Sequence, residues 1–563
     1  MTTPFLAPAR IAVAVLLVAL STRGALAQGT TPVPPTDLAY ADIERLSELG
    51  VLDSVVIGQR PYSRREIGRI VRMARIRLDR ADLAAGRGTI DDDAAVQASS
   101  ILQRLATRFE ESEERVYEGP TLALFDGMAL GFTSTDAFRR RFPASHSAPT
   151  EATIDPLALR RLGVPAERGQ TTALELSQRL EATSWLAFHA RERLEYRAPR
   201  DSTLPKTEGE LTLAAMRARF GNVALSVGRE QFAWSQSEGD GLFLASDAPA
   251  LDQISLSGDQ PFLLPGFLRG VGPTQTTIIF ADLGSSTVRS HSKLLAYKVS
   301  VAPASTFELG ATFMNHFGGE GARKSNLGNR LVDFLPFIDI FRKHNYADTT
   351  ASGDVESDKL LGLDGRLRLD HLGGLLFVGE VLIDDFDVHR LSYLFTGYSS
   401  SSLGIIIPRI GSPDWSLKLS AKHMGILTYT HYPITNGITT RGRLLGDELG
   451  PDAKSFGAEL RWIPAPSFRL KLAATSAQYS NAEYVGFYQD PAQTQWMVRK
   501  VGSTSNELRD RLIGTLELQS EAGLALVLRA GGERIRNELL RTLDEADPAP
   551  ALNRMATLGV LAA

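Results

Sequence analysis

The chain has 563 residues, a formal net charge of −4 at pH 7 and no cysteine. The absence of cysteine excludes thiol catalysis, thiolate metal sites and a disulfide scaffold. A net charge this close to neutral gives no reason to expect a nucleic acid as a partner. The 49 glycines and a mean hydropathy of −0.08 are compatible with a β-barrel, whose strands are apolar on one face only.

The N-terminus has the pattern of a secretory signal peptide. Arg10 precedes a short apolar stretch, residues 11–20, and small residues then lead to an A-x-A cleavage pattern that ends at Ala27. An apolar stretch this short spans about 15 Å as a helix, too little to cross a hydrocarbon core about 30 Å thick. We therefore predict that residues 1–27 are a signal peptide, that the chain is exported, and that cleavage follows Ala27.

No later stretch is long enough for a transmembrane helix, which takes about 20 apolar residues. The best candidate, residues 372–383, is short and contains Glu380. Helices and closed barrels are the only structures that satisfy their backbone polar groups in lipid. The mature chain is therefore expected to be soluble or to form a membrane barrel.

A polar, Pro-rich leader follows the predicted cleavage site at residues 28–35, and its composition predicts flexibility. A helix should come next, because Asp37 can cap its start and Gly50 lies where a C-terminal glycine would end it. A capping box formed by Ser63 and Glu66 predicts a second helix.

A third helix is expected after residues 91–93. Its apolar face consists of side chains at helical spacing: Val96, Ile101, Leu102, Leu105 and Phe109. Residues 28–115 together are predicted to be the leader and a helical periplasmic region. This region could plug a barrel, could dock a periplasmic partner, or could be a small structural bundle.

From residue 116 onward, apolar and polar residues alternate, as they do in β-strands with one apolar face. Five segments show this period most clearly: residues 293–301, 361–370, 414–422, 455–462 and 467–475. In the third of these, Leu417 and Leu419 alternate with Lys418 and Ser420. We predict that Leu417 faces lipid and that Lys418 faces a hydrated lumen.

Two features favour a membrane barrel over a soluble β-sandwich, whose strands also have one apolar face. The segments are about ten residues long, which is the length of a tilted strand that crosses a bilayer. Charges of both signs crowd the polar faces, as they would in a hydrated lumen.

Aromatic residues at segment ends suit a girdle at the membrane interface: Trp415, Trp462, Phe468 and Tyr479. A β-propeller is disfavoured because we find no blade-length repeat.

Residues 116–563 are therefore expected to form an all-β transmembrane barrel of antiparallel strands, preceded by the small α-helical region. Roughly 25 residues for each strand and its connection give about 18 strands, and 16 and 20 remain open because bacterial barrels use even numbers. A barrel this wide encloses space for water, loops or a plug.

Three motifs in order along the chain resemble the Wzi family of capsule assembly proteins. Residues 228–256 place a Trp-containing segment between a strand that ends in Gly-Arg and a leucine-rich strand. Residues 307–323 hold a Glu-Leu-Gly strand followed by Gly-Gly-Glu-Gly, and residues 361–387 hold a Gly-x-Asp-x-Arg strand that leads to Asp-Asp. The segments 49–51 and 61–66 are similar to the N-terminal helical region of the family.

This resemblance covers most of the mature chain. It implies an 18-stranded barrel in a bacterial outer membrane, with periplasmic helices. It also implies a lectin-like role in attaching or organising exported surface polysaccharide, without catalysis.

Residues that bind polysaccharide are sought among aromatic side chains and their polar neighbours. Aromatic faces bind the C–H surfaces of pyranose rings, and polar groups fix the hydroxyls. The candidates are Trp234, Asp240, Tyr398, Tyr429, His431 and Tyr432. The alternative interpretation of these aromatic residues is a membrane-interface girdle.

We expect no catalytic residues, no cofactor and no metal site. Residues 318–325 are rich in glycine but lack the spacing of a phosphate loop, the nine histidines are dispersed without ligand spacing, and no G-x-S-x-G elbow occurs. Asp384, Asp385 and Asp387 could hold Ca²⁺, but a hydrated strand or loop face fits their spacing better.

Two other functions remain open from the sequence. One is a porin or uptake channel. The other is an anchor protein that binds a cell-wall polymer, since the helical run through Arg65 and Glu66 is loosely similar to an S-layer-homology module. The expected partners are outer-membrane lipid, surface polysaccharide and, through the helical region, a periplasmic or cell-wall polymer.

Overall fold

A computed structural model describes most of the chain. The described residues are 30–83, 92–109, 119–137, 140–142, 152–154, 168–200, 204–237, 241–285, 289–322, 357–384, 399–425, 428–429, 437–479, 482–490, 493–500, 506–520, 523–536 and 552–562. The predicted signal peptide lies outside these residues.

Within the described residues, three helices precede a long series of strands. The helices are α2 (Ala39–Glu48), α3 (Arg64–Leu83) and α4 (Asp92–Phe109). The strands of the largest sheet are β1 (Thr121–Thr135), β4 (Gly169–Glu181), β5 (Leu186–Pro199), β6 (Lys206–Phe220), β7 (Val223–Glu230), β8 (Leu251–Gly258), β9 (Phe262–Leu263), β10 (Pro273–Asp282), β11 (Lys293–Ala304), β12 (Phe307–Phe317), β13 (Ser357–Leu369), β14 (Leu375–Ile383), β15 (Ser399–Ile407), β16 (Trp415–Met424), β19 (Ala453–Ala465), β20 (Phe468–Tyr479), β23 (Glu507–Gln519), β24 (Leu524–Arg536) and β25 (Leu552–Ala562).

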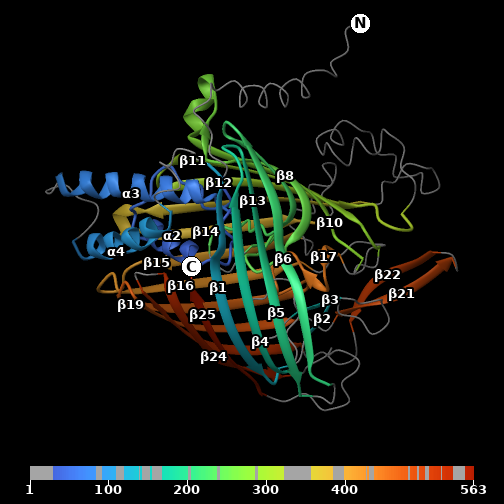
Figure 1. The fold of residues 1–563 in the computed structure, drawn as a ribbon. Helices are drawn as coiled ribbons and strands as arrows, with labels where there is room; N and C mark the ends of the chain where they lie inside the picture. Colours follow the sequence, from blue (N-terminus) through green and yellow to red (C-terminus); the bar gives the residue numbers. More distant parts are fainter. Residues whose placement is uncertain are drawn as a thin grey trace, which may run out of the picture.

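Short strands and turns lie in the connections between these strands. They are β2 (Arg140–Phe142), β3 (Ala152–Ile154), β17 (Thr439–Thr440), β18 (Arg443–Leu444), β21 (Ala482–Asp490), β22 (Gln493–Lys500) and the 3₁₀ turns η3 (Gly266–Val271) and η5 (Asp370–Leu372). The β21–β22 hairpin projects away from the barrel, opposite the helices (Figure 1).

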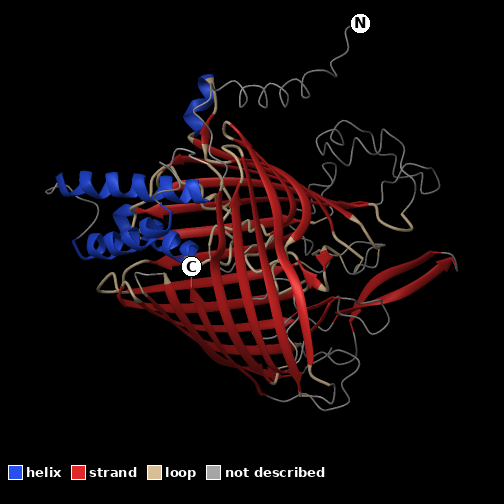
Figure 2. Cartoon of the chain, in the orientation of Figure 1, coloured by secondary structure: helices blue, strands red, loops and turns tan. Residues whose placement is uncertain are grey.

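The large sheet closes into an antiparallel barrel (Figure 2). Its strands pair in chain order, and β25 pairs back with β1, from Met128 opposite Ala562 to Thr135 opposite Met555. The sheet has 19 strands, but the two-residue β9 pairs with β10 and continues the row of β8. The wall therefore has 18 strand positions, which confirms the predicted fold class and the predicted strand number.

The two ends of the barrel differ in the length of their connections. At one end, short turns such as residues 221–222, 305–306 and 466–467 join the strands, whereas longer segments such as 318–356 join them at the other. In bacterial outer-membrane barrels the short turns are periplasmic and the long loops are extracellular. The three helices lie at the short-turn end, which is the periplasmic end (Figure 1).

Side chains on the barrel strands alternate between lipid and lumen, as predicted. On β16, Leu417 and Leu419 belong to the outer face, while Ser416 and Lys418 are buried in the lumen. The five segments with the clearest period lie in β11, β13, β16, β19 and β20. Because most strands present exposed apolar side chains, chiefly leucine, on their outer face, the barrel carries an apolar belt. Such a belt is the lipid-facing surface of an outer-membrane barrel.

Aromatic side chains gather on the outer face at the short-turn end. Trp415 stacks on Trp462 with ring centroids 5.5 Å apart, and Phe468 meets Trp462 edge-on at 5.5 Å. This part of the predicted girdle is confirmed. Tyr479 was wrongly predicted to belong to it, because its ring is buried in the lumen beside Arg509. Tyr479 lies an odd number of residues after Phe468 on one strand and therefore points to the opposite face.

The predicted helix signals occur where the sequence placed them. The N–H of Ala39 donates to Asp37 Oδ1 at 2.9 Å, and the N–H of Glu66 donates to Ser63 Oγ at 3.1 Å. Gly50 ends α2 in a left-handed conformation with φ of 78°. None of the described helices is long and apolar enough to cross a membrane.

The helices share an apolar core of their own. On α4 this core contains Ile101, Leu102, Leu105 and Phe109, as predicted. Val96 was predicted to join them but is 67% exposed. At 100° per residue, Val96 lies on the far side of α4 from the buried stripe.

The leader is packed rather than flexible from Thr30 onward, which corrects the sequence-based expectation. Val33 is buried, its N–H donates to Tyr62 O at 2.8 Å, and the hydroxyl of Tyr40 donates to Val33 O at 2.6 Å. The composition of the leader predicted a flexible linker because it gives no sign of Tyr40 and Tyr62, the partners that hold Val33 and that come later in the chain.

The lipid-facing assignment predicts the cost of a charge on β16. Leu419→Arg should lower the free energy of unfolding by about 2–4 kcal/mol, because Leu419 is exposed near the middle of the belt. Gln478→Arg is the control, since Gln478 is exposed at the long-loop end of β20 and should cost about 1 kcal/mol or less. Urea titrations in lipid vesicles measure both, and equal costs would contradict the assignment of the faces.

Candidate functional site

Within the described part of the chain, three segments enter the lumen, and we call them the plug. They are residues 51–63 and the described residues within 231–250 and within 425–452. Arg60 and Ala233 exchange two backbone hydrogen bonds of 2.9 and 3.0 Å. A segment that comes from the periplasmic helices is thereby paired with a loop that comes from the outer end of the barrel.

An apolar core joins the plug to one side of the barrel wall. Its plug members include Trp234, Leu242, Phe243, Leu244 and Tyr429, and its wall members include Ile279, Leu294, Met314, Leu360 and Leu382. These wall residues come from β10 to β14 and point into the lumen. Apolar side chains would be exposed to water there without the plug, so the plug is a packed part of the fold.

The carboxylate of Glu308 on β12 holds the plug to the wall. It accepts the backbone N–H groups of Ile57 at 2.8 Å and Gly58 at 2.9 Å. The side-chain amide of Gln236 donates to Glu308 at 3.1 Å and to Asp364 on β13 at 2.5 Å. One plug glutamine therefore links two wall strands. Because a buried carboxylate without donors is costly, these bonds fix the position of the plug.

The Gly-x-Asp-x-Arg motif lies on the lumen face of β13. A Cβ atom added to Gly362 would come within 2.3 Å of the Phe243 ring, so only glycine leaves room for the plug at this position. Arg366 donates to the backbone oxygen of Gln236 at 3.1 Å and to Ser47 Oγ at 2.8 Å. Asp364, the aspartate of the motif, accepts the hydrogen bond from the Gln236 amide that is described above. The motifs singled out in the sequence therefore position the plug.

Buried ion pairs fix the helices to the mouth of the barrel. Asp42 on α2 accepts hydrogen bonds from Arg104 on α4 at 2.8 and 3.0 Å and from Arg469 on β20 at 2.8 Å. Glu48, the last residue of α2, pairs with Arg45 at 2.9 Å and with Arg461 on β19 at 2.6 Å. All of these side chains are at least nine-tenths buried.

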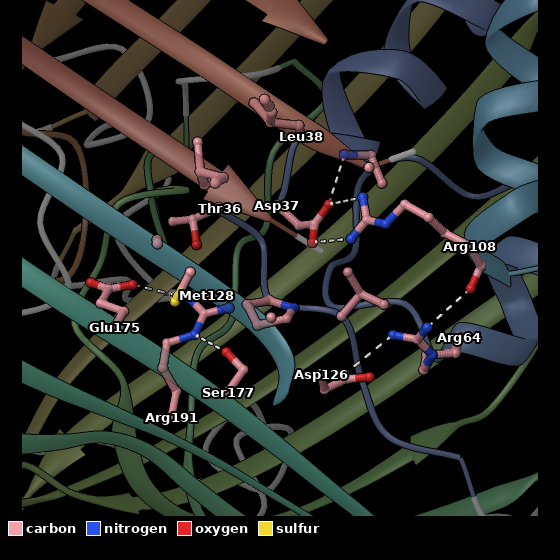
Figure 3. A pocket seen from close by; sticks show the side chains of 18 of the residues that line it. Thr36, Asp37, Leu38, Arg64, Arg108, Asp126, Met128, Glu175, Ser177 and Arg191 are labelled. Carbon is pink, nitrogen blue, oxygen red and sulfur yellow. Dashed lines mark hydrogen bonds and ion pairs between the residues drawn. The ribbon is translucent and has the colours of Figure 1, made fainter. Parts of the chain in front are cut away.

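A cavity of about 280 Å³ lies on the other side of the lumen, away from the apolar core (Figure 3). The leader, the start of α3 and the end of α4 line it on one side, and β1, β4 and β5 line it on the other. Gly127 and Ala129 of β1 are among the lining residues, and their small size leaves room in the lumen. The turn between β23 and β24 places one end of the cavity at the periplasmic end.

One closed ion pair borders this cavity. Arg108 at the end of α4 donates to both carboxylate oxygens of Asp37, at 3.0 and 2.9 Å. Burial by itself would raise the pKa of Asp37, but the Arg108 guanidinium outweighs burial and holds this pKa below its usual value. Asp37 therefore serves both as the cap of α2 and as a fixed anion that joins α2 to α4.

Two further ion pairs at the cavity are longer, and we call them open because no hydrogen bond joins their two side chains. Arg64 Nη1 lies 3.5 Å from Asp126 Oδ2, and Arg191 Nη1 lies 3.9 Å from Glu175 Oε2. The carboxylate of each pair has a closer arginine partner outside it: Asp126 accepts a hydrogen bond from Arg179 Nε at 3.1 Å, and Glu175 Oε1 lies 3.2 Å from Arg193 Nη1. Arg191 is held in place by the hydrogen bond from its Nε to Ser177 Oγ, at 3.1 Å. Figure 3 shows both pairs directed toward the cavity.

Two of the six predicted polysaccharide-binding residues are described by the structure. Trp234 and Tyr429 are each about 1% exposed, inside the plug. The hydroxyl of Tyr429 donates to Leu242 O at 2.5 Å and accepts the N–H of Asp447 at 3.0 Å. Neither ring is open to a polymer, because the connections that carry them fold inward. The structure gives both residues a packing role instead of the direct sugar contact that was predicted.

The other four predicted residues lie outside the described residues, and their role stays a prediction. They are Asp240, Tyr398, His431 and Tyr432. Of the aspartates considered for Ca²⁺, only Asp384 is described, and its carboxylate accepts the N–H of Tyr429 at 2.6 Å. Within the described part of the chain, no group of three or more His, Asp or Glu side chains could hold a metal ion.

Sequence reasoning missed the residues of the cavity. Arg191 and Glu175 occupy lumen-facing positions of β5 and β4, where alternation marks them only as hydrated. Arg64 and Asp126 lie on different elements, and no local pattern connects them. The register of the strands brings these residues together, and it is not evident from the sequence alone. In that register β4 and β5 pair Ser177 with Arg191.

Comparisons with known proteins agree with this architecture. A family model described as capsule assembly protein Wzi matches residues 139–548. A protein of Klebsiella pneumoniae, described as an uncharacterized 55.8 kDa protein in the cps region, is 27% identical over 171 residues; the match spans 30% of this chain and 32%, about a third, of that protein. The outer-membrane protein Wzi of Escherichia coli, described as a carbohydrate-binding β-barrel involved in group 1 capsule assembly, has a similar structure, with a TM-score of 0.62 at 14% identity over 94% of this chain and 98% of that one. An identity this low shows a shared fold.

The buried ion pairs predict how strongly the helices are attached. Glu48→Ala leaves Arg45 and Arg461 buried without their shared carboxylate, so it should destabilise the folded protein by about 3–5 kcal/mol. Asp79→Ala, on the exposed side of α3, is the control and should change stability by about 0.5 kcal/mol or less. Hydrogen exchange of the α2 amides, measured together with urea unfolding, tests this; unchanged protection in Glu48→Ala would show that the pair does not hold α2.

Proposed function

The chain belongs to the Wzi family of capsule assembly proteins, and on that basis we propose that it binds and organises exported polysaccharide at the surface of a bacterial outer membrane. Its apolar belt and closed barrel place it in that membrane. The observation that carries the proposal is the plug. A filled lumen turns the long-loop end into a surface on which a polymer can lie.

The plug also weighs against the porin alternative. A porin needs a water-filled passage, and its lumen is accordingly lined by polar residues. Here the core around Trp234 and Phe243 packs against β10 to β14 and fills that side of the lumen. The 280 Å³ cavity is bounded by the leader and the helices at the periplasmic end.

Contacts with the polymer are proposed for the connections at the long-loop end. Asp240, Tyr398, His431 and Tyr432 belong by sequence to the connections that follow β7, β14 and β16. Aromatic rings and their polar neighbours suit pyranose rings. Each contact is expected to be weak, and many contacts along one polymer add up through effective concentration.

The proposed function is retention of the polymer without its hydrolysis. The sequence offers no thiol and no G-x-S-x-G elbow. For the helical region we propose contact with a periplasmic or cell-wall polymer, because the outward side of α3 carries the exposed arginines Arg72 and Arg80.

Polysaccharide retention tests the proposed function. Purified protein should retain the surface polysaccharide of its host without releasing reducing ends over time. Tyr398→Ala and Tyr432→Ala should each weaken retention several-fold. Tyr429→Phe is the control: it removes only a hydroxyl that bonds inside the plug, so it should keep retention while lowering stability by about 1 kcal/mol.

Two results would contradict this proposal. Undiminished retention by both alanine variants would remove these tyrosines from the site. Accumulation of reducing ends would show that the protein hydrolyses the polymer, and no retention at all by the native protein would refute the proposed function.

Conductance in planar bilayers tests the closed lumen. The native protein should show no large steady current, because the plug is packed against the wall by Glu308, Gln236 and the core around Phe243. Removing the ring in Phe243→Ala opens a void beside Gly362 and should increase the frequency of brief openings. A large, steady current through the native protein would favour the porin function instead.

A further inference from the structure

The cavity at the periplasmic end brings two open ion pairs together. Arg191 and Glu175 come from neighbouring strands of the wall, whereas Arg64 comes from the start of α3 and Asp126 from β1. All four side chains line the same space of about 280 Å³ (Figure 3). A volume close to the lower end of known ligand pockets, roughly 300 Å³, suits one small ligand.

These pairs leave hydrogen-bonding capacity unused within the described part of the chain. The two terminal nitrogens of Arg191 have no acceptor within 3.5 Å there, since the Glu175 carboxylate lies 3.9 Å away. The Nε–H of Arg64 is buried and has no partner among the described residues. Buried donors without acceptors are costly, so a ligand that supplies oxygen atoms would stabilise the site.

We propose that this cavity binds a neutral saccharide unit that enters from the periplasm. A hydroxyl group accepts and donates hydrogen bonds at once. One sugar hydroxyl can therefore bridge Arg191 and Glu175, and another can bridge Arg64 and Asp126. An anion would meet two carboxylates at these positions, and a cation would meet two guanidinium groups, so the paired charges select a neutral ligand rich in hydroxyls.

Two features of the lining agree with a polar mode of recognition. Among the described residues that line the cavity, none is a phenylalanine, tyrosine or tryptophan, so binding rests on hydrogen bonds rather than on stacking. Asp37 and Arg108 form a closed pair beside the two open ones and hold the leader that forms one wall. The Asp37–Arg108 bonds therefore hold the wall of the cavity in place whether or not a ligand is bound.

This inference rests on the proposed function for the carbohydrate class of its ligand, but it assigns a second site at the opposite end of the barrel. A saccharide held there would be one that has not yet crossed the membrane, and the long polymer at the cell surface would not reach it past the plug.

The test fills the cavity without removing any charge. Ala129→Phe places a ring in the cavity, whereas Leu130→Phe, one residue along β1, places the same ring on the lipid face, where Leu130 is 49% exposed. Binding of D-galactose and D-glucose to the detergent-solubilised full chain is measured by saturation-transfer NMR. We expect the signal in the native protein and in Leu130→Phe, and at least a tenfold weaker signal in Ala129→Phe.

Heat-modifiable migration shows whether each variant has folded. If Ala129→Phe fails to fold, Arg191→Met replaces it, because this change removes the donor and keeps the bulk of the side chain. An undiminished galactose signal in the folded variant would overturn the proposal, as would the absence of a signal in the native protein. Displacement of the sugar by sulfate or D-glucuronate at equal concentration would overturn the neutral ligand class.

Retention of polysaccharide by the same variants separates this site from the proposed function. Ala129→Phe should retain surface polysaccharide as the native protein does while it loses the galactose signal. Loss of both together would place the two activities in one site and would overturn the assignment of a second site. Failure of the native protein to retain polymer would refute the proposed function. The galactose signal would then decide by itself whether the cavity binds a saccharide.

Discussion

Every charge on the lumen wall of this barrel needs a partner, and the plug and the helices provide many of those partners. A barrel of 18 strands encloses more space than its own side chains fill. Glu308 receives its hydrogen bonds from Ile57, Gly58 and Gln236, none of which belongs to the wall. Asp42 and Glu48 in turn neutralise Arg469 and Arg461. Because an unpaired buried charge costs several kcal/mol, the wall and its contents form one structure.

The same constraint divides the lumen into two unlike halves. Along β10 to β14 the wall turns apolar side chains toward the plug, and the space between them is closed. Along β1, β4 and β5 the lumen-facing residues are small or charged, and a cavity remains. The closed half is the basis of the proposal that the outer end of the barrel presents a surface and not a pore. The open half gives the periplasmic end a polar cavity between the leader and the wall.

The motifs that indicated the family acquire a physical meaning from this arrangement. Gly362 admits the Phe243 ring, and Arg366 reaches the backbone of Gln236. Trp234, the tryptophan of the first motif, is buried in the same core. These residues belong to the contact between plug and wall. In this chain they pack the plug into the barrel, whereas the polymer contacts proposed above lie at other positions of the connections between the strands.

Alternation of apolar and polar residues predicted the barrel and the lipid face of β16, because lipid on one side and water on the other impose a period of two on every strand. The number of about 18 strands came from the length of the region, which left 16 and 20 open, and from the resemblance to the family. Local signals likewise predicted the helix starts at Asp37 and Ser63. Tyr479 was placed in the girdle because it is an aromatic residue at the end of a segment, although alternation puts it on the face opposite Phe468. Alternation assigns a residue to a face but not to a partner, so Trp234 and Tyr429 were expected at a sugar surface. Only the tertiary structure decided which connections fold into the lumen and which carboxylate lies near Arg191. Those contacts join residues that are far apart in the sequence, and they come close together only when the barrel closes.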